Sequence, residues 1–365
     1  MSADDERFLR LALSLAEKAR GRTSPNPLVG ALIVKNGRVL SVGYHRGAGL
    51  PHAEIEALRK LKPGQARGAT LYLNLEPCSH TDKRTPPCVP AIIAAGIRRV
   101  VCCMEDPNPR VKGIEQLRKA GVRVDVGLLE REARELNAAY IKHITTGLPL
   151  VTLKLALSFD GKIATGTGES KWISGGASRA LVQHLRAESD AVMVGINTVL
   201  KDDPELACRI PGAKQPLRVI LDSRLRIPLT ARVLRDSNVM IATTSRASKR
   251  KRAALSARGI AVWASNSPRV NIRALLRFLV SRGITSVLCE GGSELAGSLV
   301  DARLVDRFVF FIAPKIIGGG GKDAVGGKGV SRLARAWKLR FTRLERVGED
   351  ILIEAKPAAP RTKCI

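Results

Sequence analysis

Aromatic residues, long apolar runs and acidic residues are all scarce in this 365-residue chain, and each scarcity limits the class of protein that it can be. Phe, Trp and Tyr make up 4% of the residues, a poor supply for proteins that stack flipped-out bases on aromatic side chains. No apolar run approaches the ~20 residues that a membrane helix requires. The chain opens with MSADDE, which is acidic where a secretory signal is positively charged. We therefore expect a cytoplasmic protein with no membrane segment.

The remaining composition narrows the class further. Seven cysteines in a chain of this length do not make a disulfide framework, so metal ligands or buried thiols are the better interpretations. The shortage of acidic residues, 33 against 61 basic ones, gives a net charge of +28. Such a surface attracts nucleic acid or phosphorylated metabolites, although a host whose proteins are generally basic would give the same number. We interpret the basic run at 249–252 as a solvated surface run.

Periodicity divides the chain into two α/β domains. Residues 5–20 have helical spacing, and strands at 29–34 and 38–44 join through Asn36-Gly37, a hairpin signal. Helices at 52–61, 89–95 and 114–120 then alternate with strands at 69–75, 98–104 and 122–126, which predicts a layered α/β sandwich. Residues 138–149 break the rhythm. We predict domains at 1–147 and 148–356 and a loose tail at 357–365.

The alternation restarts in the second domain. Its predicted strands and helices are strand 151–158, helix 177–187, strands 191–195, 217–222 and 239–243, helix 272–282, strand 286–289, helix 294–300 and strand 307–314.

One set of residues is suited to metal binding. His52-Ala-Glu54 begins a predicted helix, and Pro77-Cys78 and Cys88 follow a predicted strand. Catalytic zinc takes imidazole and thiolate ligands and leaves one position to water, whose pKa falls to about 7. A lone His or Cys is usually structural, but this order of residues is the signature of zinc deaminases, in which the Glu moves the proton. The other cysteines, Cys102, Cys103, Cys208, Cys289 and Cys364, are interpreted as core residues.

The motifs SPNPLVG (24–30), GYH (43–45), PHAE (51–54), LEPCSH (75–80) and RTPPC (84–88) resemble the bifunctional riboflavin-biosynthesis deaminase–reductase family. The resemblance implies a cytidine-deaminase-like three-layer sandwich in which Asn26, His45 and His80 line the substrate pocket. Asn26 before a proline is also typical of a turn. Nine residues separate Cys78 from Cys88, one more than is usual in the family, with the extra residue at 81–83. The segment 106–113 is two residues short.

The second half contains a Gly-Gly turn, EGGSELAG (290–297), between a strand and a helix. Glycines allow backbone N–H groups at such a turn to approach a pyrophosphate, but this is not the Gly-x-Gly-x-x-Gly fingerprint of a Rossmann fold. The segments 153–161, 169–174, 195–204 and 290–297 resemble the reductase half of the same family, which has a dihydrofolate-reductase-like fold. By that resemblance the NADPH-binding residues are Ala156, Trp172, Thr198, Asp202, Ser223, Gly292, Ser293, Glu294, Leu295, Ala296, Gly297 and Ser298.

The same resemblance implies a second set of residues that bind the phosphorylated pyrimidine substrate. Arginine pairs suit a phosphate. Arg186 lies on a predicted helix and could instead be a solvated surface residue, and Leu206 could instead be an ordinary packing residue. The substrate-binding residues implied in this half are Lys154, Ser170, Arg186, Leu206, Arg209 and Glu290.

The resemblance implies a sequence of two reactions. The first is hydrolytic deamination of 2,5-diamino-6-(5-phosphoribosylamino)pyrimidin-4(3H)-one, with zinc on His52, Cys78 and Cys88 and Glu54 as proton carrier. The second is NADPH-dependent reduction to 5-amino-6-(5-phosphoribitylamino)uracil. A nucleic-acid deaminase would suit the charge but leaves the second half unexplained. A binding protein with a structural zinc would need four protein ligands. Two further alternatives are not decided by the sequence: an enzyme that retains one of the two steps, and assembly as a homo-oligomer.

Overall fold

The computed structural model describes residues 2–81 and 85–358, and the chain divides into two compact units, Met1–Gly147 and Leu148–Ile365. Residues 359–365 of the tail predicted at 357–365, among them Cys364, lie outside the described residues, as do residues 82 and 83 of the lengthened loop. Pro357, placed in the tail by the sequence, ends a strand. None of the described helices is long and apolar enough to cross a membrane.

The first unit is built on a five-stranded sheet in the order β2-β1-β3-β4-β5. β1 pairs antiparallel with both β2 and β3, whereas β3, β4 and β5 run parallel. The predicted hairpin is confirmed: Asn36 and Gly37 both have positive φ between β1 and β2. The strands are β1 (Gly30–Lys35), β2 (Arg38–Tyr44), β3 (Thr70–Leu73), β4 (Arg99–Cys102) and β5 (Arg123–Val126).

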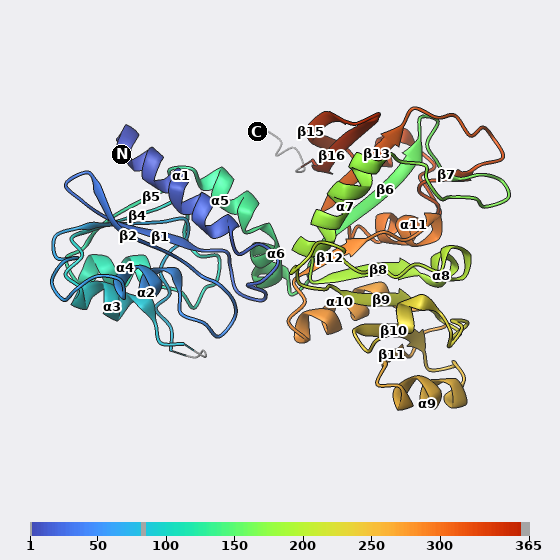
Figure 1. The fold of residues 1–365 in the computed structure, drawn as a ribbon, viewed down its shortest axis with the longest axis horizontal. Helices are drawn as coiled ribbons and strands as arrows, with labels where there is room; N and C mark the ends of the chain where they lie inside the picture. Colours follow the sequence, from blue (N-terminus) through green and yellow to red (C-terminus); the bar gives the residue numbers. More distant parts are fainter. Residues whose placement is uncertain (1, 82–84, 359–365) are drawn as a thin grey trace. The chain divides into compact units, whose positions relative to one another are not determined.

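Helices cover both faces of this sheet, which confirms the three-layer sandwich (Figure 1). Apolar residues of α1 and α5 pack on one face, and those of α2, α3 and α4 pack on the other. Residues 138–149 were predicted to be a break, but most of them form helix α6, which ends at Gly147 in the left-handed conformation. The helices are α1 (Ala3–Glu17), α2 (Ala53–Leu58), α3 (Cys88–Ala94), α4 (Gly113–Lys119), α5 (Glu130–Leu136) and α6 (Ala138–Thr146).

The second unit contains a nine-stranded sheet in the order β11-β10-β9-β8-β12-β6-β13-β16-β15. The strands from β11 to β13 are all parallel, and β16 and β15 add an antiparallel edge. The carboxyl ends of the parallel strands therefore meet at one edge, where ligands bind in open α/β sheets. The strands are β6 (Leu150–Ser158), β8 (Ala191–Gly195), β9 (Leu217–Leu221), β10 (Val239–Thr244), β11 (Ala261–Ser265), β12 (Ser286–Cys289), β13 (Arg307–Ala313), β15 (Leu339–Val347) and β16 (Asp350–Pro357).

The helices of this unit pack on both faces of its sheet. α10 and α11 contribute to one core cluster, and α8 and α9 to another on the opposite face. The basic run 249–252, interpreted as a surface run, begins helix α9 behind the N-cap Ser248. The remaining elements are α7 (Gly176–Glu188), α8 (Ile196–Asp202), α9 (Lys249–Ala257), α10 (Ile272–Ser281), α11 (Ser293–Asp301), the short pair β7 (Lys162–Ala164) and β14 (Lys322–Asp323), and the 3-10 turns Arg232–Leu234 and Leu333–Arg335.

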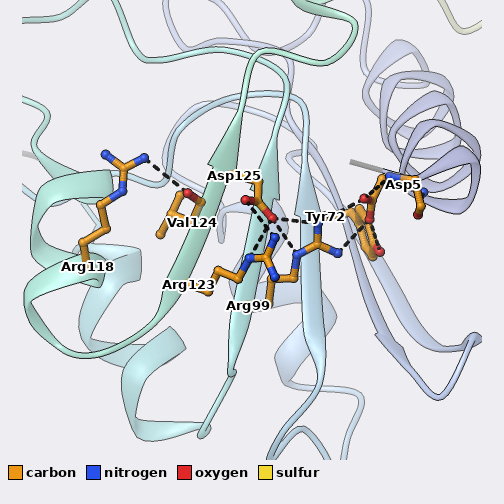
Figure 2. A network of polar contacts seen from close by, with 8 residues as sticks. Asp5, Tyr72, Arg99, Arg118, Arg123, Val124 and Asp125 are labelled. Atoms are coloured by element: carbon orange, nitrogen blue, oxygen red, sulfur yellow. Dashed lines mark hydrogen bonds and ion pairs between the residues drawn. The ribbon is translucent and has the colours of Figure 1, made fainter.

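A buried ionic network fastens α1 to the first sheet (Figure 2). Arg99 on β4 donates two hydrogen bonds to Asp5, at 2.8 and 3.0 Å, and its Nε donates to Asp125 at 2.7 Å. The Tyr72 hydroxyl donates to Asp5 at 2.8 Å. Burial alone would raise the pKa of Asp5, but the hydrogen bonds from Arg99, the Ser2 backbone and Tyr72 outweigh it and hold that pKa well below its usual range.

Asp5→Asn is expected to destabilise the protein at pH 7 by about 3 kcal/mol, because it removes one of the two carboxylates that pair with the largely buried guanidinium of Arg99. Since the folded-state pKa is depressed, the stabilisation is fully present above the ordinary value of 3.8 and is lost as the pH falls below it. Thermal unfolding at pH 7 and at lower pH measures both effects. Asp4→Asn is the matched control, because Asp4 is exposed and pairs with the exposed Arg7; an equal loss from both variants would contradict the account.

Candidate active sites

Three predicted ligands lie close together in the first unit, two of them at helix starts. His52 is the N-cap of α2, Cys88 is the first residue of α3, and Cys78 lies on the segment that follows β3. The Nδ1 atom of His52 lies 3.3 Å from each of the two sulfurs. A tetrahedral zinc with these ligands separates its donor atoms by roughly 3.5 Å. The three donor atoms lie within 4.8 Å of one another, so the set fits a zinc ion.

The opposite side of the His52 ring is held by Thr85, whose hydroxyl lies 3.0 Å from Nε2. If Nδ1 binds the metal, Nε2 carries the proton and donates it to the Thr85 oxygen. A hydrogen bond of this kind fixes the tautomer and the orientation of a metal-binding histidine. Thr85 belongs to the RTPPC motif (84–88), but no role is predicted for it from the sequence.

Glu54 lies on α2, two residues after His52, and its side chain is buried. Burial raises the pKa of Glu54, and the nearby Cys78 raises it further. A carboxyl group with a raised pKa can both accept and return a proton near neutral pH. Glu54 is outside the group of three donor atoms that could share a metal among the described residues.

The predicted pocket residues Asn26 and His45 form a pair beside the metal ligands. The Asn26 amide lies 3.0 Å from Nε2 of His45, and the other ring nitrogen of His45 lies 3.1 Å from the Pro51 carbonyl. The His45 ring meets the His52 ring edge-on at 5.3 Å between centroids. Asn26 also donates its backbone N–H to Thr23, so it is a turn residue as well. His80 lies half-buried on the same segment as Cys78.

Two buried asparagines that the sequence did not single out hold the segment carrying Asn26. Asn74 accepts from the Gly30 N–H and donates to the Leu28 carbonyl, both at 2.8 Å. Asn137 accepts from the Leu28 N–H at 2.8 Å and donates to the same carbonyl. Both partners lie far away in the sequence, and an isolated Asn carries no local signal for such a role. The cysteines predicted to be core residues, Cys102, Cys103, Cys208 and Cys289, are buried.

At the carboxyl edge of the second sheet, three predicted substrate-binding residues form one buried cluster. Glu290 follows β12 directly, and Arg186 on α7 donates two hydrogen bonds to it, at 2.6 and 3.0 Å. Lys154 on β6 lies 3.9 Å from the same carboxylate. Burial would raise the pKa of Glu290, but Arg186 and Lys154 outweigh it and keep it low; burial lowers the pKa of Lys154. Arg186 is therefore not a solvated surface residue.

Other predicted residues of this half lie along the same edge or beside it. The Ser170 hydroxyl donates to Asp202 at 3.0 Å, which joins a predicted substrate residue to a predicted cofactor residue. Ala156 lies two residues after Lys154 on β6 and therefore faces the same side of the sheet. Ser223 follows β9, and its hydroxyl accepts from the Val270 N–H.

Three predicted residues differ from these in their surroundings. Leu206 is 4% exposed and belongs to the core, which agrees with the alternative of ordinary packing. Arg209 has a side chain that is 70% exposed and lies 4.0 Å from Glu205. Trp172 is 66% exposed, has a φ of +66°, and lies under the guanidinium of Arg179 at 4.4 Å.

The Gly-Gly turn leads into α11, with Gly292 as N-cap and Thr198 beside it. Leu295 and Ala296 are core residues, whereas Glu294 and Ser298 are exposed. A Cβ on Gly297 would lie 2.2 Å from the Gly326 backbone, so this glycine is required for close packing of two chain segments. Most of the predicted loop 292–298 is therefore helical. Gly292 precedes α11, and Ser293 is the first residue of the helix.

Comparison with known proteins agrees with this geometry. Residues 2–104 match the family described as the cytidine and deoxycytidylate deaminase zinc-binding region, and residues 149–353 match the RibD C-terminal domain. The riboflavin biosynthesis protein RibD of Aquifex aeolicus is 45% identical over 96% of this chain and 97% of its own length. That of Escherichia coli is 38% identical over 96% of this chain and 98% of its own length.

Solved structures give the same result. Acinetobacter baumannii RibD has a TM-score of 0.89 at 37% identity, covering 98% of this chain and 99% of that one. A diaminohydroxyphosphoribosylaminopyrimidine deaminase/5-amino-6-(5-phosphoribosylamino)uracil reductase from Thermotoga maritima has a TM-score of 0.86 at 36% identity, covering 97% and 99%.

The fold and the two sites thus define a zinc-dependent deaminase joined to an NADPH-dependent reductase in one chain. The chain belongs to the bifunctional RibD family of riboflavin biosynthesis, as the sequence motifs indicated. This excludes the alternative of a binding protein with only a structural zinc.

Proposed function

We propose that His52, Cys78 and Cys88 hold the zinc and that Glu54 carries the proton in a deaminase site for a free phosphorylated pyrimidine. The observation that carries this proposal is the 3.3 Å approach of His52 Nδ1 to both sulfurs, with a buried carboxylate two residues away. Among the described residues, three protein ligands leave the fourth position open, as a catalytic site requires. The substrate is 2,5-diamino-6-(5-phosphoribosylamino)pyrimidin-4(3H)-one, which loses the amino group on C2.

Each residue of this site then has one task. When bound, zinc lowers the pKa of a coordinated water to about 7 and so supplies the nucleophile. Glu54 would accept a proton from the attacking water and deliver it to the C2 amino group, which then leaves as ammonia. Thr85 orients His52. Asn26 and His45, already paired with each other, present their polar groups to the substrate.

The reductase site is proposed to bind the deaminated product at the carboxyl edge of the second sheet. When bound, NADPH supplies the hydride that reduces C1′ of the opened ribose. Arg186, Lys154 and Glu290 bind the sugar and its phosphate, because two cations and one carboxylate match an anionic polyol. Ser170, Leu206 and Arg209 complete the proposed substrate set, and the proposed cofactor residues are Ala156, Trp172, Thr198, Asp202, Ser223 and the loop 292–298.

We also propose domain limits of 1–147 and 148–356, a cytoplasmic location and no requirement for nucleic acid. The division into two compact units supports the boundary between residues 147 and 148. The low aromatic content supports the proposal that the protein does not require nucleic acid, despite its net charge of +28.

Purified, zinc-loaded protein is expected to release ammonia from the free diaminopyrimidine ribotide with no RNA or DNA present. The measurement compares ammonia release from that nucleotide with release from tRNA and single-stranded DNA. Activity on tRNA alone would contradict the proposed substrate class and favour a nucleic-acid deaminase.

A further inference from the structure

The segment 76–79 carries Cys78 but belongs to no helix or strand, so its position must be fixed by its contacts. On one side it is tied to α3: the Cys88 N–H lies 3.0 Å from the Cys78 carbonyl oxygen and 3.4 Å from the Cys78 sulfur. These contacts join two metal ligands to each other. They do not tie the segment to the sheet.

The second support is Glu76, a buried residue with an exposed fraction of 8%. One of its carboxylate oxygens accepts the N–H of Asp106 and the other accepts the N–H of Ile114, both at 2.9 Å. Its own N–H donates to the Met104 carbonyl at 3.0 Å. One carboxylate therefore joins the two ends of residues 106–114, which we name the clamp segment.

The clamp segment also touches the residues on either side of Cys78. The Lys112 N–H donates to the Ser79 hydroxyl at 2.7 Å. Gly113 lies against the Pro77 carbonyl so closely that an added Cβ would be 1.9 Å from its oxygen. Residues 76, 77 and 79 are thus all held, and the ligand between them has little freedom to move.

The clamp segment is itself anchored. The Asp106 carboxylate accepts from the Tyr140 hydroxyl on α6, at 2.9 and 3.1 Å, and from the Asn108 N–H at 2.8 Å. The Asn108 carboxamide oxygen in turn accepts the Arg110 N–H at 3.1 Å. The segment is therefore held in shape by its own side chains.

Glu76 suits this position because it offers two acceptors and no donor. Two backbone N–H groups point at it, and each needs an acceptor when it is out of contact with water. An amide in its place would satisfy one N–H group and direct its own NH₂ at the other. The chemistry of the position therefore requires a carboxylate.

We infer that Glu76 is a positioning residue of the deaminase site: it fixes Cys78 for metal binding by locking the clamp segment against the Pro77–Ser79 backbone. This inference rests on the proposed zinc ligand set. Residues that orient metal ligands typically change metal affinity by roughly 10- to 100-fold when they are replaced.

Glu76→Gln is expected to raise the Kd for zinc roughly ten-fold, measured by competition with a chromogenic chelator. Gly113→Ala is expected to do the same from the other side, because its methyl group must displace the Pro77 carbonyl. In the cobalt-substituted protein, both variants are expected to shift the thiolate-to-cobalt charge-transfer band, which reports the sulfur–metal geometry directly.

Glu105→Gln and Gly47→Ala are the matched controls and should keep the affinity and the spectrum of the parent protein. Glu105 is exposed, and a Cβ on Gly47 would meet its neighbours at ordinary distances of 3.5 and 3.7 Å. Parent-like zinc affinity and cobalt spectrum in Glu76→Gln would overturn the inference. If Glu76→Gln does not fold, Ser79→Ala provides the test. A Kd for zinc raised a few-fold supports the inference, and an unchanged Kd overturns it. Cys78→Ser should abolish tight binding; if it does not, the ligand set itself is wrong.

Discussion

Glu54→Gln is expected to lower the rate of ammonia release by roughly 10²- to 10⁴-fold while zinc remains bound. NADPH oxidation with the deaminated intermediate supplied directly is expected to be unchanged. General acid–base catalysis contributes about this factor, and a glutamine can neither accept the proton of the attacking water nor return it. Glu54 lies outside the group of metal-binding atoms, so its replacement leaves His52, Cys78 and Cys88 in place. Zinc content, ammonia release and NADPH oxidation are measured on the same preparation.

Glu56→Gln is the matched control for that variant. Glu56 lies on the same helix, is more exposed, and faces Arg46 at 3.8 Å. Its replacement is expected to leave ammonia release close to that of the parent protein. Loss of zinc in Glu54→Gln would make Glu54 a ligand, and full activity would assign the proton transfer to another group.

Glu290→Gln is expected to lower kcat/KM for NADPH-dependent reduction of the deaminated intermediate by roughly 10- to 100-fold. The change removes charge-assisted hydrogen bonds from Arg186, each worth about 1.5–3 kcal/mol, and leaves Arg186 and Lys154 buried without their carboxylate. Ammonia release should not change, because the deaminase ligands belong to the other unit. Steady-state kinetics with the intermediate supplied directly measures the effect.

The control for Glu290→Gln is Glu188→Gln on α7, an exposed carboxylate two residues from Arg186. Thermal unfolding of both variants separates lost binding from lost folding, since removing one member of a buried ion pair also destabilises the protein. A Glu290→Gln protein that folds normally and reduces its substrate with the parent kcat/KM would remove Glu290 from the proposed site.

The sequence was sufficient for the metal-ligand candidates because each lies in a short motif, with His52 and Cys88 at predictable helix starts and Cys78 after a predictable strand. It also predicted the five strands of the first sheet and six of the nine strands of the second, but it missed α5, α8, α9, β11 and β16. It failed at residues 138–149, where the Thr145-Thr-Gly-Leu-Pro149 turn signal hid the helical spacing of α6. It also missed β15, whose residues are mostly exposed and show no clear alternation of apolar and polar side chains.

The supporting residues could not be predicted in the same way. Glu76, Asn74 and Thr85 act through partners that lie 30 to 46 residues away in the sequence, and a single chain without its fold gives no sign of them. Glu76 stands within the quoted LEPCSH motif, yet only the structure reveals that its two oxygens meet the ends of the clamp segment. Local chemistry is readable from sequence, whereas the contacts that position it depend on tertiary structure.

The most direct test of two successive chemistries in one chain is the stoichiometry of the two reactions on purified, zinc-loaded protein. We expect the diaminopyrimidine ribotide alone to yield one equivalent of ammonia without NADPH. Subsequent addition of NADPH should then consume one equivalent of the cofactor, and a zinc chelator should abolish the first step but not the second. NADPH oxidation that requires no prior ammonia release, or the absence of either reaction, would contradict the account.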